Sequence, residues 1–192
     1  MAANKSLTVD LGPADEAAIE TTEKALGASL PGDYRAWVRA RDGLEGWIAG
    51  AYIAFWPVSA LQQLNAAIQT DRFAPRLLVF ATNGAGVGYG FETRVSPWPV
   101  AEFPMIGMDW GLAETRASSF DNFLKALEAT PGQPDHLDTS KLGLQIHEIK
   151  PVIVGGDPTD PANKKLLPMT DYLPLTLWWN ERIAAVRKQG AH

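Results

Sequence analysis

Cysteine is absent from this sequence of 192 residues, and histidine is scarce. Without cysteine the chain can form no disulfide, no cysteine-based zinc site and no thiol nucleophile, and it suits a reducing compartment. The three histidines, His136, His147 and His192, are too few and too scattered along the chain to form a metal cage. These absences argue against redox and metal chemistry.

An excess of basic residues is also missing. The chain has 22 Asp and Glu against 17 Lys and Arg, a net charge of −5, which argues against a dedicated binder of nucleic acid or of anionic membranes. The least charged stretch, residues 46–70, is interrupted by Pro57 and by polar residues, so it does not predict a membrane span. Residues 1–12 carry no secretory signal, and we therefore expect a soluble cytoplasmic protein.

The spacing that common catalytic and ligand-binding motifs require is lacking as well. The alternating glycines between positions 84 and 90 resemble a phosphate-binding loop, but Tyr89 and Phe91 occupy the places where its last glycine should stand. They predict a hairpin turn instead, centred on Asn83 and Gly84. No nucleophile elbow is present.

Acidic and amide side chains offer two weaker alternatives. Asp157, Asp160 and Asn163 could present oxygens to a hard cation, but they do not have the spacing of a calcium loop. A carboxylate pair such as Glu92 and Glu102 stays open, because residues that meet only in space are invisible in a sequence. We predict no catalytic residue, no cofactor and no metal.

What the chain does have is apolar and aromatic side chains. Hydrophobic residues make up 46% of it and aromatic residues 9%, with seven Trp, which is enough to form the core of one domain. Periodicity predicts helices over residues 13–26, 31–41, 58–70, 119–129 and from Thr170 onward. It predicts strands over residues 51–56, 76–81, 87–93, 99–106 and 146–154. The aromatic residues expected in the core are Trp37, Trp56, Phe80, Phe91 and Phe123.

The composition changes after Thr130. Residues 131–143 combine proline, glycine and charge, which is typical of a loop or linker. We expect a main domain over residues 1–130 and a C-terminal extension over residues 131–192 that packs on the same domain. The extension carries seven acids and seven bases, so the acidity lies in the first two thirds of the chain.

Several tryptophans stand where a core does not obviously require them. Trp47, Trp98 and Trp110 lie in segments rich in Gly and Pro and near acidic residues. Tryptophan is enriched among the residues that dominate protein interfaces, although these side chains could equally cap an open end of the sheet. The predicted partner-binding residues are Asp42, Glu45, Trp47, Asn83, Trp98, Glu102, Asp109 and Trp110.

The order of these elements resembles the SUKH superfamily, also called the Smi/Knr cell-wall-assembly regulator family. The resemblance covers residues 14–130, and Asp42-Gly43 departs from it, because members more often have Asn-Gly there. The matching positions are Leu26-Gly27, Leu30-Pro31, Tyr34, Asp42-Gly43, Ile53, Trp56, Leu77–Phe80, Asn83-Gly84-Ala85-Gly86, Tyr89, Phe91, Pro99-Val100, Ser119-Phe120 and Phe123-Leu124.

The resemblance implies an α+β fold: a twisted, mostly antiparallel sheet with flanking helices, followed here by a C-terminal strand–loop–helix extension. It implies no catalytic residues. Bacterial members are mostly immunity proteins, so the leading hypothesis is a non-enzymatic protein that neutralises a cognate toxin domain, for example a basic nuclease. The alternatives are a scaffold or regulatory protein without a toxin partner, and a hydrolase whose site the sequence does not reveal. The oligomeric state stays open.

Overall fold

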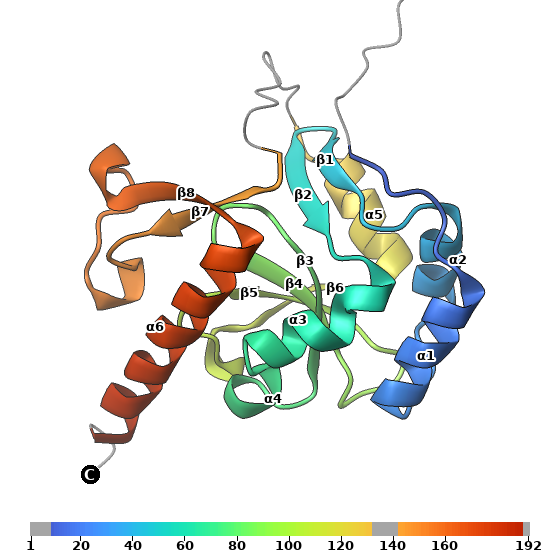
Figure 1. Cartoon of the computed structure of the whole chain (residues 1–192), viewed down its shortest axis with the longest axis horizontal. Coiled ribbons are helices and arrows are strands. Elements are labelled where there is room, and N and C mark those ends of the chain that lie inside the picture. Colours follow the sequence, from blue (N-terminus) through green and yellow to red (C-terminus); the bar gives the residue numbers. More distant parts are fainter. Residues whose placement is uncertain (1–8, 132–141, 190–192) are drawn as a thin grey trace, which may run out of the picture.

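The computed structural model describes residues 9–131 and 142–189. The loop predicted at 131–143 therefore falls almost wholly outside the described residues. Helices surround a central sheet, and a long helix runs along one edge of the molecule (Figure 1). The α-helices are α1 (Glu16–Leu26), α2 (Gly32–Ala40), α3 (Leu61–Ala67), α4 (Thr70–Phe73), α5 (Phe120–Glu128) and α6 (Met169–Gln189).

The main sheet has six strands in sequence order, and every neighbouring pair is antiparallel. A second sheet of two antiparallel strands belongs to the C-terminal extension. This arrangement confirms the predicted α+β class with a twisted antiparallel sheet and a C-terminal strand–loop–helix. The strands are β1 (Glu45–Ile48), β2 (Ala51–Phe55), β3 (Leu77–Thr82), β4 (Val87–Glu92), β5 (Val100–Pro104), β6 (Glu114–Ala117), β7 (Leu144–Glu148) and β8 (Lys164–Pro168).

Three strands were not predicted. β1 contains a glycine and pairs with β2 in a hairpin, so Trp47 lies in a strand and not in a loop. β6 is mostly exposed and its residues do not alternate between apolar and polar, while β8 has one buried residue. In each case pairing with a neighbouring strand supplies the order that the side-chain pattern does not predict.

Several predicted element boundaries were wrong. The helix expected over 58–70 is a 3-10 turn, η1 (Val58–Ala60), followed by α3, and the chain then turns through Gln69 at φ 50°. The strand expected over 146–154 ends at Glu148 and leads to a second 3-10 turn, η4 (Val152–Val154), that starts after Pro151. Thr170 lies inside α6, which begins at Met169, and so does not cap it.

Side chains and a glycine close other helix ends. Helix α1 begins at Glu16, three residues later than predicted, because the Asp15 carboxylate caps it by accepting the Ala17 N–H, and Gly27 ends it in the left-handed region at φ 66°. The Ser119 hydroxyl caps α5 by accepting the Asn122 N–H. These side chains satisfy backbone groups that a helix end leaves unpaired.

The core is an aromatic cluster between the sheet and helices α2 and α5. Phe80 on β3 is fully buried, and its ring centroid lies 4.6 Å from that of Phe91 and 5.7 Å from that of Phe123. Trp56 is also buried, whereas Trp37 is half-buried and packs against the core. The aromatic core positions expected from the sequence are therefore confirmed, with Trp37 at the margin.

Polar contacts join the extension to the sheet. The Thr82 hydroxyl donates to Gln145 Oε1 at 2.8 Å, and the Ile146 N–H donates to the Gly84 carbonyl at 2.7 Å. From α6, the buried Asn180 side chain accepts the Gly107 N–H at 2.6 Å and donates to the Met105 carbonyl at 3.0 Å. We propose that residues 142–189 fold together with residues 9–131 as one unit.

We predict that Asn180→Leu lowers the free energy of unfolding by about 3 kcal/mol, because it leaves buried backbone groups of Met105 and Gly107 without a partner. Urea denaturation measures the loss. The control is Asn122→Leu at the exposed start of α5, which should cost no more than about 0.5 kcal/mol. A separate early transition for the C-terminal extension in the wild-type protein would contradict the single folding unit.

His147 generates a second prediction. It is buried on β7, and its Nδ1 has no hydrogen-bond partner among the described residues. Burial, helped by nearby Lys165, lowers the pKa of His147 below its ordinary value of 6.5, although Glu148 opposes the shift. Protonation of His147 therefore favours the unfolded chain. The contribution of the neutral side chain to the free energy of unfolding is fully present above pH 6.5 and is lost as the pH falls below that value.

We expect His147→Gln to flatten the fall in stability between pH 7 and pH 5, measured by thermal unfolding across that range. His136 and His192 stay unchanged in the variant, so the difference from wild type isolates His147. If both proteins lost stability equally on acidification, the assignment to His147 would be wrong.

Candidate functional site

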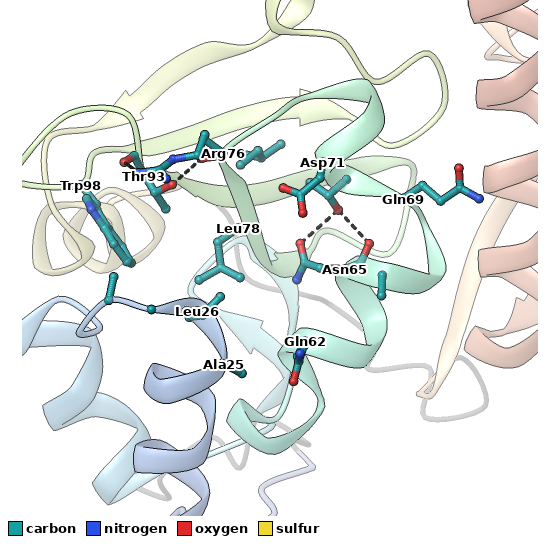
Figure 2. A pocket seen from close by; sticks show the side chains of 15 residues that line it. Ala25, Leu26, Gln62, Asn65, Gln69, Asp71, Arg76, Leu78, Thr93 and Trp98 are labelled. Carbon is teal, nitrogen blue, oxygen red and sulfur yellow. Dashed lines mark hydrogen bonds between the residues drawn. The ribbon is translucent and has the colours of Figure 1, made fainter.

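A cleft of about 500 Å³ lies at one end of the sheet, beside the start of β3 and the loop after β4. The end of α1 forms one side, and α3 with the turn into α4 forms another (Figure 2). Leu26 and Leu78 give it an apolar floor, and the Trp98 indole forms part of its wall. The cleft thus joins apolar and polar surface in one concave site, which is typical of binding sites.

Asn65 holds the α3 side of the cleft against the sheet. Its Nδ2 donates to the carbonyls of Leu61 and Val79, both at 2.8 Å, and its Oδ1 accepts the Val79 N–H at 2.9 Å. The Thr70 hydroxyl also donates to Asn65, at 3.1 Å. Because these bonds occupy the Asn65 amide, it acts as a structural support.

The opposite rim is tied between the ends of β3 and β4. The Arg76 guanidinium donates to the Thr93 carbonyl at 3.1 Å, and the Thr93 hydroxyl and N–H both donate to the Arg76 carbonyl at 2.9 Å. Asp71 in α4, on the other side of the cleft, is exposed and makes no ion pair with another residue in 9–131 or 142–189. The cleft lining therefore includes one guanidinium and one carboxylate.

The rim also contains strained backbone. In the described part of the chain, three residues other than glycine have positive φ, and two of them, Gln69 at 50° and Arg76 at 70°, line this cleft. The left-handed region is unfavourable for residues with a Cβ atom, and such strain clusters at functional sites. The cleft is therefore a better functional candidate than its composition alone indicates.

The cleft is suited to recognition more than to bond-making. Its lining residues include two charged side chains, Asp71 and Arg76, and no histidine, serine or tyrosine. The hydroxyl groups of Thr70 and Thr93 already donate to other protein atoms. A general base next to a nucleophile, which hydrolytic sites use, is not found among these lining residues.

Two predicted contact tryptophans lie at this end of the sheet. Trp98 lines the cleft, with its ring centroid 6.1 Å from that of Phe91. Trp110 donates its indole N–H to the Pro75 carbonyl at 2.9 Å, and the Arg94 guanidinium lies 3.6 Å from its ring centroid. Together they extend the cleft wall with aromatic and cationic surface.

Three other predicted residues lie at the opposite end, near the β3–β4 turn. Asn83 Oδ1 accepts the N–H groups of Ala85 and Val87, so this side chain shapes the turn. The Glu45 carboxylate accepts the Tyr52 hydroxyl, and Trp47 packs on Tyr52 with ring centroids 5.5 Å apart. Burial and then Glu45 raise the pKa of Tyr52. The predicted residues therefore do not form one surface.

The remaining predicted acids have internal partners. Asp42 is buried, and its carboxylate accepts the Val58 N–H at 2.9 Å, while burial raises its pKa. It supports the turn before η1, and little of its surface is exposed. Glu102 is paired with Arg116 at 3.6 Å, and Asp109 with Arg187 at 3.3 Å.

The oxygen-rich loop of the extension is used internally. Asp157 accepts the Thr159 N–H and hydroxyl, and Asp160 accepts the Ala162 N–H. Asn163 bonds the backbone of Lys150 on both sides, through its Oδ1 and Nδ2. Within residues 9–131 and 142–189, no three His, Asp or Glu side chains gather in a way that could hold a metal ion.

The strain at the cleft rim can be tested with one substitution at two places. We expect Gln69→Gly to raise the free energy of unfolding by about 1 kcal/mol, because glycine carries no penalty in the left-handed region. The matched control, Gln63→Gly, places the same change on the exposed surface of α3 and should lower stability by about 1 kcal/mol. Urea denaturation compares them, and equal losses would contradict strain at Gln69.

None of the helices in the described ranges is long and apolar enough to span a bilayer. Comparison with curated proteins finds no match. The model of the SMI1 / KNR4 family (SUKH-1) matches residues 13–126, which span α1, the six-stranded sheet and most of α5, and therefore the whole cleft. The match covers more than half of the chain and stops before the C-terminal extension, and the chain accordingly belongs to the SMI1 / KNR4 family (SUKH-1).

Proposed function

We propose that this protein is a non-enzymatic immunity protein, which binds a cognate bacterial toxin domain in the cytoplasm and blocks its activity. The observation that carries the proposal is the family match over residues 13–126, since bacterial members of this family are mostly immunity proteins. The chemistry of the cleft supports it, because the lining side chains suit recognition and include no nucleophile–base pair.

The cleft end of the sheet is the proposed contact surface. It brings the indole rings of Trp98 and Trp110 together with the guanidinium groups of Arg76 and Arg94. Tryptophan and arginine are the residue types that most often dominate binding energy. Internal hydrogen bonds already fix this surface, so less conformational entropy is lost when a partner binds.

The charge of the main domain indicates the kind of toxin. Residues 9–131 contain 15 Asp and Glu against 9 Lys and Arg, whereas residues 142–189 contain 5 against 6. An acidic surface favours a basic partner, such as the substrate groove of a nuclease, because opposite charges speed the encounter and oppose wrong partners. At the cleft itself the arginines Arg76 and Arg94 lie beside a single lining carboxylate, Asp71, so Asp71 is the group there that would meet a basic residue of the partner.

Co-expression with a toxin encoded beside this gene tests the proposal. We expect wild-type protein to restore growth and to form a complex measurable by calorimetry. Asp71→Lys should weaken that complex roughly tenfold through charge repulsion. Glu128→Lys changes the charge equally at the exposed end of α5, where a cation suits the helix dipole, and should leave the affinity within about threefold.

The two parts of the proposal fail separately. Absence of both rescue and complex would overturn the immunity function and would favour a scaffold or regulatory role. A tight complex that tolerates Asp71→Lys as well as Glu128→Lys would retain the immunity function and overturn the placement of the contact surface at the cleft.

A further inference from the structure

A second hollow lies where the C-terminal extension packs against the main sheet. Its volume is about 380 Å³, which lies within the range of small-molecule sites in proteins. The main domain contributes Val87 of β4 and Leu112, which ends a 3-10 turn, and the extension contributes Ile146 of β7 and Val152 of η4. We call this hollow the junction pocket, because both parts of the chain are needed to form it.

The junction pocket leaves apolar surface open to water. Leu112, Val152 and Ile153 line it and remain 43%, 50% and 42% exposed. Ile153 is also seated against the main domain, since a Cβ atom on Gly107 would lie 2.8 Å from its Cδ1. An apolar group placed in the pocket would remove part of these side chains from water, which is favourable. The body of a fitting ligand is therefore apolar.

The lining also contains a carboxylate without a cation. Glu148 of β7 is half-buried, and its Oε2 accepts the Val152 N–H at 3.0 Å. Among the described residues it forms no ion pair, even with Lys164, which lies opposite it on β8. A carboxylate has room for several hydrogen bonds, so Glu148 can accept more than the one it has.

Tyr172 of α6 is the second polar group in the lining. It is 1% exposed, and its hydroxyl has no hydrogen-bond partner within residues 9–131 and 142–189. Burial and then the charge of Glu148 raise the pKa of Tyr172 to about 12, against the opposing effect of nearby Thr176, whose own hydroxyl is also unpaired. A buried polar group without a partner is costly and indicates a missing one.

These two polar groups determine the chemistry of the ligand. An ammonium group can donate to both, because the carboxylate and the phenol oxygen are acceptors, and its charge complements Glu148. A negatively charged ligand would be repelled there. We therefore propose that the junction pocket binds a small apolar amine, with its apolar body between Leu112 and Val152 and its ammonium group at Glu148 and Tyr172.

The proposed site is independent of the toxin and of the cleft. Six of the twelve lining residues belong to the extension, and the match to the family model ends before them. A ligand in the pocket touches both the main domain and the extension. Because it binds the folded chain, it should also raise the temperature of unfolding.

Two probes with the same body and opposite charge test the proposal. Tryptamine and indole-3-propionate share an indole ring, but the first ends in an ammonium group and the second in a carboxylate. We expect calorimetry to give a Kd of roughly 0.5 mM for tryptamine, and binding of indole-3-propionate to be at least about tenfold weaker. In NMR spectra tryptamine should shift the amide signals of residues 85–87 and 146–153, at the pocket, and leave those of residues 65–71, at the cleft, unchanged.

Three variants identify the groups that hold the amine. Glu148→Gln keeps an oxygen for the Val152 N–H but removes the charge, so it should weaken tryptamine binding about tenfold and abolish the preference for it. Tyr172→Phe should weaken binding about threefold without lowering the temperature of unfolding, because its hydroxyl has no internal partner to lose. The matched control is Glu128→Gln at the exposed end of α5, which should leave the affinity unchanged.

Several results would overturn the proposal. They are absence of saturation up to roughly 10 mM tryptamine, equal binding of the two probes, signal changes centred on the cleft, and unchanged affinity in either Glu148→Gln or Tyr172→Phe. None of these results bears on the immunity function, because no toxin takes part in the experiment.

Discussion

The burial of Phe80 is the constraint on which the rest of the structure depends. Its ring centroid lies within 6.2 Å of aromatic rings from α2, β2, β4 and α5. One side chain in the middle of the sheet thus holds the helices on that face. Helix α1 is held in turn through the ion pair between Glu23 and Arg35 of α2, at 3.0 Å, and through the Thr22 hydroxyl, which donates to the Val58 carbonyl. The cleft beside α1 therefore depends on the aromatic core.

The cleft results from this packing, and hydrogen bonds from polar side chains stabilise its borders. Residues of α1, α3, α4 and β3 and of the loop after β4 border it. Polar side chains connect these segments: Asn65 joins α3 to β3, and Thr93 joins the end of β4 to the start of β3. These bonds maintain the unfavourable backbone at Gln69 and Arg76. Such internal bonding would limit the conformational entropy lost on binding, which is consistent with the recognition role proposed for the cleft.

Sequence patterns predicted well wherever an element obeyed its own periodicity. β3 and β4 alternate or are wholly apolar, and the Asn83-Gly84 turn joins them, so both strands were predicted within a residue or two. β6 has no apolar alternation and is ordered by its pairing with β5, so nothing local predicted it. The cleft was missed for a related reason. Asp71 and Arg76 form no motif, and they line one cleft with Leu26 and Trp98 only because α1, α3, α4 and β3 pack together.

The sequence predicted the periodic helices and strands of the main domain, the aromatic positions of the core and the family, because each rests on local spacing, but it did not predict β1, β6 or β8. Which polar side chains meet was not readable. Asp42 is buried beneath η1, Trp98 faces a cleft and Asn83 shapes a turn at the other end of the sheet. Periodicity determines which side of an element is apolar, but the neighbour that a polar group finds depends on contacts between residues far apart in the chain. Tertiary packing therefore determines the site, whereas the spacing of apolar residues along the chain determines the helices and strands that enclose it.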